Sequence, residues 1–347
     1  TVAATTGGAV EIKGGKIDVS DTDITGVINA TAAACVIAAG NKNVTASAAD
    51  VEILSAGVVN AGTHALKVSN AAGTVTLAAA GTVTKTGAGA LAINLAAGNV
   101  GNIGVTGAPA IAVTNTSLNG ARTVGNITPA GGALTITAGT ANLTVGQTLG
   151  ATAGTVTISG GASAIAIGNM ATTGSLAITA GSAPVTAGNY TGTPTVTGGG
   201  TGLVTLGVIT GNVSITGHPT ADLNVAHISA ANVNITAGAA AVTVGTITGN
   251  ALVGDAAGGG GAVNLGSISG TLSITSTNKA PVTVALGANT VTGATSVAGG
   301  TTAGSKVTLT GSGNSGAVTI TRGHVDVSGW TGTGAINITA AAASSVT

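Results

Sequence analysis

Short bursts of alternating apolar and polar residues recur along the chain. In "VNITAG" (233–238), the apolar residues Val233 and Ile235 alternate with polar ones. Alternation over four or five positions predicts a strand with one buried face, and Thr, Val and Ile favour extended backbone because they branch at Cβ. Glycine follows most bursts and permits a tight bend. The pattern therefore predicts many short strands joined by tight corners.

These bursts form a repeat. Many end in an isoleucine followed by Thr or Ser, and isoleucines of this kind recur at a spacing of about 20 residues or near twice that distance. They are Ile136, Ile158, Ile178, Ile215, Ile235, Ile274, Ile320 and Ile338. A second burst follows the first halfway through the period, as at 240–246, and a lone apolar residue such as Ile247 often comes shortly after it. The unit is therefore two short strands and a third apolar contact.

The repeat predicts an all-β protein, a right-handed parallel β-solenoid with about 20 residues per turn. No helical period is present, and the links between bursts are too short for a crossover helix. The hairpin signal Asn-Gly is nearly absent, with an exception at 118–121. Stacked turns would place aliphatic pairs such as Val213/Ile215 in inward columns, and Thr, Ser and Asn in outward columns.

The chain is predicted to have two parts. Residues 1–60 are expected to form irregular, more charged N-terminal turns that serve as a cap or a subunit contact, and residues 61–347 a regular β-solenoid. Eleven of the eighteen charged residues lie in 1–85, where the repeat is least regular. The other end, 335–347, shows no cap, and an uncapped coil exposes unpaired strand edges. We therefore expect this edge to pair with another subunit, and head-to-tail pairing would make a filament.

Composition narrows the function classes. Sixty residues are Gly, 5% are charged and 1% are aromatic, with no Phe, so the core must be thin and built from Val, Ile, Leu and Ala. The formal net charge is zero, which gives no electrostatic footprint for nucleic acid or for an anionic membrane. Gly and Thr interrupt every apolar stretch, so the chain is not expected to span a membrane.

Few residues suggest chemistry. Asp18, Asp21 and Asp23 in "DVSDTD" are a weak Ca²⁺ candidate, because Ca²⁺ takes six or more oxygen ligands. The alternative is that they are solvated acids of the cap. His324 and Asp326 point outward on one strand, which invites a catalytic interpretation. The sequence places no nucleophile beside them, so a surface pair is the alternative. We therefore expect no enzyme, no catalytic residues and no cofactor other than Ca²⁺.

Two glycine-rich stretches and one cysteine are also interpreted as structural. "GSGNSG" (311–316) matches G-x-G-x-x-G, but it precedes a predicted strand where a dinucleotide site needs a helix. "GTTAGSK" (300–306) has the wrong order for a phosphate-binding loop. Cys35, the only cysteine, stands between alanines and is expected to be a small buried residue. It excludes an internal disulfide and a cysteine-rich zinc site.

The repeats quoted above resemble those of bacterial secreted β-solenoid surface proteins, such as filamentous haemagglutinin-like adhesins. Surface-layer and extracellular-fibre proteins of similar composition fit as well. The resemblance covers about residues 60–340 and implies an exported, non-enzymatic protein at the cell surface. It includes no match to the secretion-domain motifs of the adhesin family.

Three functions remain open from the sequence. The first is an extracellular structural subunit that assembles, head to tail, into a fibre or surface layer, with other copies of itself as its partner. The second is a cell-surface adhesin that binds carbohydrate through its Thr, Ser and Asn face. The third is ice binding, since regular Thr columns on a flat strand face can order water.

Overall fold

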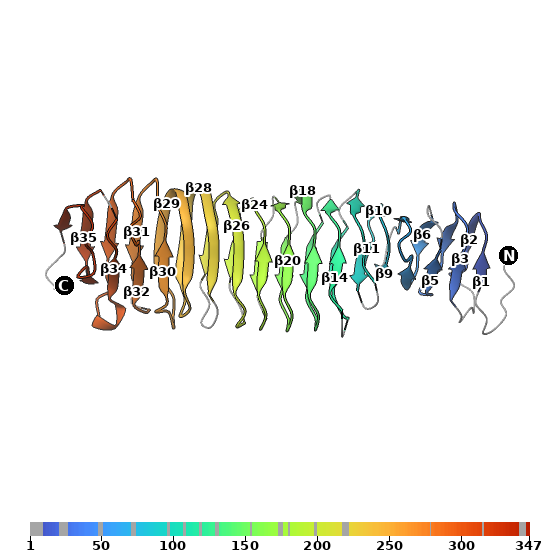
Figure 1. Ribbon diagram of the computed structural model, residues 1–347, viewed down its shortest axis with the longest axis horizontal. Coiled ribbons are helices and arrows are strands. Elements are labelled where there is room, and N and C mark those ends of the chain that lie inside the picture. Colours follow the sequence, from blue (N-terminus) through green and yellow to red (C-terminus); the bar gives the residue numbers. More distant parts are fainter. Residues whose placement is uncertain are drawn as a thin grey trace. The chain divides into compact units, whose positions relative to one another are not determined.

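A computed structural model describes most of the chain. The described residues are 10–20, 27–47, 51–70, 74–95, 98–106, 109–117, 120–128, 132–152, 155–172, 176–179, 181–197, 200–216, 222–277, 279–313, 316–339 and 345–347. They form two compact units, unit 1 (Thr1–Gly174) and unit 2 (Ser175–Thr347). Apart from one 3-10 turn, η1 (Ala303–Ser305), the regular elements of the described residues are all β-strands. Figure 1 shows them stacked side by side within each unit.

In unit 1, the first ladder of parallel strands takes one strand from each coil. Its strands are β1 (Val10–Ile12), β3 (Ile28–Ala30), β5 (Val44–Ala46), β7 (Val58–Asn60), β9 (Thr74–Ala79), β11 (Ala90–Asn94), β13 (Ile111–Thr114), β16 (Leu134–Thr137) and β19 (Val156–Ser159). Each pairs in parallel with the next. Hydrogen bonds therefore run from coil to coil, as in a β-solenoid.

A second ladder of unit 1 takes the other strands. It starts with β2 (Lys16–Asp18), β4 (Val36–Ala38), β6 (Val51–Ser55), β8 (Leu66–Val68), β10 (Val83–Lys85) and β12 (Ile103–Val105). Beyond β12 this line continues through β15 (Ile127–Thr128), β18 (Thr148–Thr152) and β21 (Met170–Thr172). A third line begins beside it with the bridges of Val100 to Ala80 and to Val124, and it contains β14 (Arg122–Val124), β17 (Leu143–Val145) and β20 (Ile165–Ile167). The coils thus change from two strands to three.

Unit 2 is built from three-sided coils. Its strands are β22 (Leu176–Thr179), β23 (Val185–Ala187), β24 (Tyr190–Thr191), β25 (Thr195–Thr197), β26 (Val204–Thr210), β27 (Val213–Thr216), β28 (Leu223–Ala237), β29 (Val242–Asp255), β30 (Ala262–Leu265), β31 (Leu272–Thr275), β32 (Val282–Ala285), β33 (Thr295–Ala298), β34 (Val307–Thr310), β35 (Val318–Arg322), β36 (His324–Asp326), β37 (Ile336–Ile338) and β38 (Ser345–Val346). The first ladder runs from β25 through β27, β28, β29, β31, β33 and β35 to β37. The second ladder runs from β23 through β26, β28, β29, β30, β32, β34 and β36 to β38.

The core of each unit is a set of aliphatic columns. The predicted pairs Val213/Ile215 and Val233/Ile235 stack in register and are at most 3% exposed. The lone apolar residues form a third column, in which Ile228 pairs with Ile247 and Ile247 with Ile268. Small branched side chains fill this interior because neighbouring coils are only about 4.8 Å apart. The predicted parallel β-solenoid is confirmed.

Two strands of unit 2, β28 and β29, are longer than the sequence pattern predicts. The bursts at 221–227 and 232–238 are predicted as separate strands, but residues 223–237 form the single strand β28. The links inside β28 are Ala226 and Ala230–Ala231, whereas β29 (Val242–Asp255) is equally continuous with Gly245 and Gly249 at the same corners. Gly249, with a φ of 136°, makes the equivalent bend inside β29.

Candidate functional site

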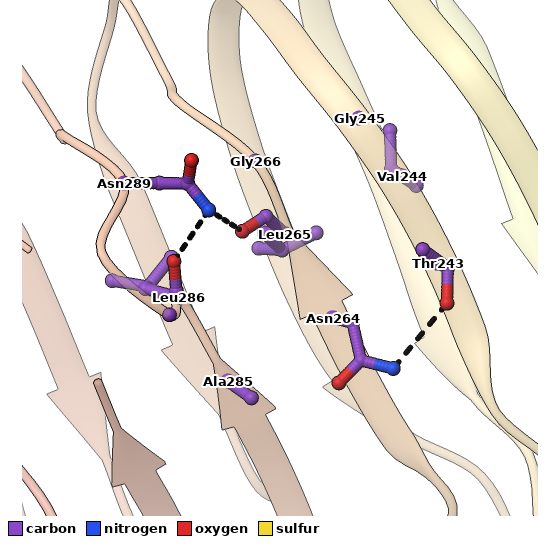
Figure 2. Close-up of a pocket in the computed structure, with 10 residues that line it drawn as sticks. Thr243, Val244, Gly245, Asn264, Leu265, Gly266, Ala285, Leu286 and Asn289 are labelled. Carbon is purple, nitrogen blue, oxygen red and sulfur yellow. Dashed lines mark hydrogen bonds between the residues drawn. The ribbon is translucent and has the colours of Figure 1, made fainter. Parts of the chain in front are cut away.

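A shallow hollow of about 380 Å³ brings polar side chains together on the surface of unit 2. It crosses three stacked coils and is lined by Thr243, Val244, Gly245, Asn264, Leu265, Gly266, Ala285, Leu286, Gly287 and Asn289. Figure 2 shows that β29, β30 and β32 with the turn after it supply these residues. The hollow is therefore a product of the repeat, with one set of similar residues from each coil.

Hydrogen bonds hold the polar side chains of this hollow in place. The Asn264 amide nitrogen donates to the Thr243 hydroxyl at 3.3 Å, one coil away (Figure 2). The Asn289 amide nitrogen donates to the carbonyl oxygens of Leu265, at 3.2 Å, and Leu286, at 2.6 Å. Both amide groups still have acceptor capacity on their oxygen atoms, since an amide oxygen carries two lone pairs.

Corner glycines create the hollow. A Cβ on Gly245 would lie 1.9 Å from the Ala226 carbonyl oxygen, and one on Gly266 would lie 2.3 Å from that of Gly245. The coils approach so closely here that backbone stacks directly on backbone, and the Gly266 N–H donates to the carbonyl oxygens of Val244 and Gly245. The absent side chains leave the surface concave.

Asparagine side chains link successive coils at the same corner. The Asn102 amide oxygen accepts the Asn126 N–H, and the Asn126 amide oxygen accepts the Gln147 N–H, both at 2.9 Å. Asn189 does the same for the N–H of Val208 at 2.9 Å. These side chains provide acceptors for backbone N–H groups at the bends of the coil. Sequence reasoning missed this role, although Gly-Asn recurs directly after the second burst, in "VGNI" (124–127) and "AGNY" (187–190).

The predicted outward columns are present. In unit 1 Thr135 stacks on Thr157, and in unit 2 Thr195, Ser214 and Asn234 stack in register. The next position of that column is Leu252, which is 47% exposed. The hydroxyl and amide face is therefore interrupted within unit 2.

The Ca²⁺ candidate is only partly within the described residues. The Asp18 carboxylate accepts hydrogen bonds from the Ser20 N–H, at 3.0 Å, and the Ser20 hydroxyl, at 2.6 Å. These bonds, the hydroxyl bond above all, hold the pKa of Asp18 below its ordinary value. Asp21 and Asp23 lie outside the described residues. Within the part that is described, no three His, Cys, Asp or Glu side chains gather as a metal site.

Asp326 binds a lysine and a serine in the structure. One Asp326 oxygen pairs with the Lys306 ammonium at 2.8 Å, and the other accepts the Ser328 N–H at 3.0 Å and its hydroxyl at 2.6 Å. Lys306 first, and Ser328 second, hold the pKa of Asp326 well below its ordinary value. Asp326 therefore joins neighbouring coils and forms the turn after β36, and both of its oxygens have partners other than His324.

Asp255 is a buried carboxylate that sequence reasoning did not single out. It is 5% exposed and accepts hydrogen bonds from Ser276, Thr277, Lys279 and Ala280 of the next coil. Burial alone would raise the pKa of Asp255, but these hydrogen bonds outweigh it, and the pKa lies well below its ordinary value. Asp255 stands at a strand position that the apolar–polar alternation predicts to face inward. This position was the sequence signal that could have indicated its burial.

Lys85 is a second buried charge. Its side chain is fully buried, in a column between Val68 and Val105, and its ammonium donates to the carbonyl oxygens of Thr86 and Gly87. Burial lowers the pKa of Lys85. The aliphatic stem fills the core while the charged end binds backbone at the following turn.

The remaining sequence motifs take structural places. Cys35 is fully buried, as predicted. In 300–306 the short turn η1 precedes β34, and the Ser305 hydroxyl donates to the Thr302 carbonyl at 2.9 Å. In 311–316 a Cβ on Gly313 would meet the Asn289 carbonyl oxygen at 1.5 Å, so this glycine serves coil stacking.

Comparison with protein-family models, curated proteins and solved structures finds no match. Among the described residues, no helix is long and apolar enough to cross a membrane. The function is therefore argued from the chain's own contacts.

Proposed function

We propose that the protein is an extracellular structural subunit whose β-solenoid coils assemble, copy upon copy, into a fibre or surface layer, and that it is not an enzyme. The observation that carries the proposal is the last coil of unit 2. Ile336 is 41% and Ile338 is 59% exposed, whereas their partners one coil earlier, Val318 and Ile320, are fully buried. The apolar column is therefore partly exposed to water at β37.

Covering these side chains would contribute to the free energy of association. Burying an isoleucine side chain stabilises by about 1.5–3 kcal/mol. A coil of a second copy stacked on β37 would also add parallel strand pairing, of the kind that β35 makes with it. The same interactions that hold coil to coil inside each unit would thus hold one copy to the next.

The charged groups support a structural role. Asp255 holds the turn of the following coil, Asp326 and Lys306 link neighbouring coils, and Glu52 pairs with Lys67 at 3.1 Å across adjacent coils. Each of these carboxylates is engaged in stacking or turn formation. Such groups stabilise the fold and are not held ready for proton transfer.

Electron microscopy of the purified chain tests the proposal. We expect negatively stained samples to contain polymers whose number grows with protein concentration, and sedimentation velocity to show species larger than a monomer. A chain that sediments as a monomer at every concentration up to the millimolar range contradicts the proposal.

A second candidate, carbohydrate binding, is favoured by the hollow at Thr243, Asn264 and Asn289. Ordered amide and hydroxyl groups over a shallow, largely apolar floor suit one face of a sugar ring. A glycan array is the test, with Asn264→Ala as the variant and Asn234→Ala, on another face of the coil, as the control. Binding that Asn264→Ala abolishes and Asn234→Ala retains supports it, and an array without hits contradicts it.

A further inference from the structure

We propose that two copies of the chain pair side by side through the outer face of the first ladder in unit 2, about a two-fold axis that passes between Leu252 and Gly254. Each copy places its Leu252 side chain in the space above Gly254 of the other. This contact is lateral, so it does not depend on the coil-on-coil stacking of the proposed function. The occupant is a second copy because one strand carries both a protruding side chain and a space that receives it.

The protruding side chain is Leu252, on a face whose other outward side chains are polar or small. Leu252 stands in an outward column between Asn234 and Ser273 and is 47% exposed. Farther along this column stand Ser214 and Ser296. Strand β29 is paired on both sides, with β28 and with β31, so an end of the stack does not cause this exposure. A large apolar side chain is thus held in water that a partner would displace.

The receiving space lies at Gly254, in the neighbouring outward column. Gly254 stands between Thr236 and Thr275, and an added Cβ would have only the Thr275 carbonyl oxygen within 4 Å, at 3.9 Å. Gly254 is not one of the glycines with a positive φ, so its backbone does not require glycine. It also lacks the close backbone contact found at Gly245. Stacking of the coils therefore does not explain this glycine, whereas a side chain from another copy does.

A two-fold axis makes the face complementary to itself. Leu252 and Gly254 lie two residues apart on the same side of β29, because side chains alternate along a strand. An axis parallel to the direction of coil stacking, and passing over Val253, exchanges the two positions. Each Leu252 then faces Gly254 of the other copy, which makes the contact isologous. The same axis sets Asn234 opposite Thr236 of the second copy, so the two polar columns also face each other.

The central part of this face carries no charged side chain. The outward positions of the first ladder in β27, β28, β29, β31 and β33 are Ser214, Thr216, Asn234, Thr236, Leu252, Gly254, Ser273, Thr275, Ser296 and Ala298. Hydroxyl and amide groups both donate and accept, so they can bond to the same groups on another copy. Like charges, which would oppose the pairing of two identical faces, do not meet here.

The face is large enough for a weak specific dimer. Its eight strands run from β25 to β37 and stack about 4.8 Å apart, and four residues of a strand span about 13 Å. Each copy therefore offers about 500 Å², and the pair buries about 1,000 Å² in total. This area is at the lower limit for specific interfaces, so the pair is expected to dissociate on dilution.

An exchange of the two residues tests the contact. Leu252→Gly removes the protruding side chain, and Gly254→Leu fills the space that receives it. The double variant Leu252→Gly/Gly254→Leu regains a complementary face, because the two-fold axis exchanges the two positions. Leu252→Ser repeats the first test without a new glycine in the strand. Leu203→Gly is the matched control, since Leu203 is 39% exposed in the link before β26, on another side of the coil.

Circular dichroism and urea unfolding establish that each variant is folded before sedimentation velocity is measured over a concentration series. We expect wild type, Leu203→Gly and the double variant to form dimers. Leu252→Gly, Leu252→Ser and Gly254→Leu should each raise the dissociation constant of the dimer at least about tenfold. A double variant that pairs as weakly as the single variants, or a wild type without lateral pairs, overturns the contact.

Negative-stain microscopy separates this contact from the proposed function. Fibres that are one copy wide in the wild type and in every variant overturn the lateral contact and leave the proposed function in place. Paired copies that never lengthen into fibres support the lateral contact and contradict the proposed function. A wild type that stays monomeric overturns both.

Discussion

The short coils of unit 1 and the long coils that follow them build the same ladders from different amounts of chain. In a short coil Val44 pairs with Val59, whereas in a long coil Ile103 pairs with Ile127, which is much farther along the sequence. The additional residues form a third side, with its own buried column. Coil length therefore sets the number of sides, while the spacing between coils is fixed by backbone hydrogen bonding in both regions.

The two regions also differ in the side chains on their outer faces. The short coils carry the outward pair of Glu52 and Lys67, whereas the outward columns of the long coils consist mostly of Thr, Ser and Asn, with the pair of Lys306 and Asp326 near their end.

Corner glycines occur in both kinds of coil, since a Cβ on Gly57 would lie 2.4 Å from the Asn41 carbonyl oxygen and one on Gly245 would lie 1.9 Å from that of Ala226. The long coils also have longer links, and the link after β29 is held by Asp255. The longer links of the third side thus depend on polar anchors.

The largest expected effect comes from a side chain at the corner of a long coil. Gly245→Ala would place a Cβ 1.9 Å from the Ala226 carbonyl oxygen, so the backbone must shift in two coils. Overpacking of this kind costs about 3 kcal/mol. We expect a clear fall in the urea midpoint of unfolding.

Gly254→Ala is the control, because Gly254 lies in the same strand and its added Cβ would have only Thr275 oxygen near it, at 3.9 Å. This variant should unfold within about 0.5 kcal/mol of wild type. Equal midpoints for the two variants would show that the corner glycine does not determine how the long coils stack.

The second prediction concerns Asp255, which holds the link after β29. Asp255→Ala leaves the N–H groups of Thr277 and Lys279 without their acceptor, and an unsatisfied buried donor costs about 1–3 kcal/mol. We expect a loss of about 2 kcal/mol in the free energy of unfolding at pH 7. Asp222→Ala is the control, since Asp222 is exposed and accepts one hydrogen bond, from the Ala241 N–H.

Lowering the pH should reduce the free energy of unfolding as Asp255→Ala does. The pKa of Asp255 is lower in the folded chain than its ordinary value of 3.8, so the unfolded chain takes up its proton first. Its contribution is complete above pH 3.8 and is lost as the pH falls below it. The difference between wild type and Asp255→Ala should therefore shrink between pH 4 and pH 2. A difference that is constant over this range would contradict the role of the carboxylate.

Repetition made the fold predictable. The isoleucine anchors, the second burst and the lone apolar residue are local patterns, and a parallel stack is the structure in which all three become buried columns. The Gly-Asn corner, Asp255 and Lys85 were not predicted. Their roles depend on which residues lie one coil away, and coil length differs between the two regions, so one fixed period does not align them. The Ca²⁺ site at Asp18, Asp21 and Asp23 stays a prediction, because Asp21 and Asp23 lie outside the described residues.

The smallest expected effect concerns Lys85, which lies where coil length changes. The step along the chain from Val68 to Lys85 is shorter than the step from Lys85 to Val105. We expect Lys85→Met to keep the packing of the stem and to remove a charge whose burial is unfavourable, which stabilises the chain by about 1 kcal/mol at pH 7. Lys67→Met, on the exposed outer face beside Glu52, should change stability by less than about 0.5 kcal/mol.

The pH dependence separates charge burial from packing at Lys85. Its pKa is lower in the folded chain than the ordinary value of 10.5, so the folded chain releases the proton first. Between the two pKa values the unfolded chain binds more protons, and the free energy of unfolding of the wild type rises with pH. The advantage of Lys85→Met over the wild type should therefore be greatest at neutral pH and shrink as the pH approaches 10.5. An advantage that does not change with pH would assign the effect to packing, and a destabilised Lys85→Met would show that the bonds to Thr86 and Gly87 hold the two kinds of coil together.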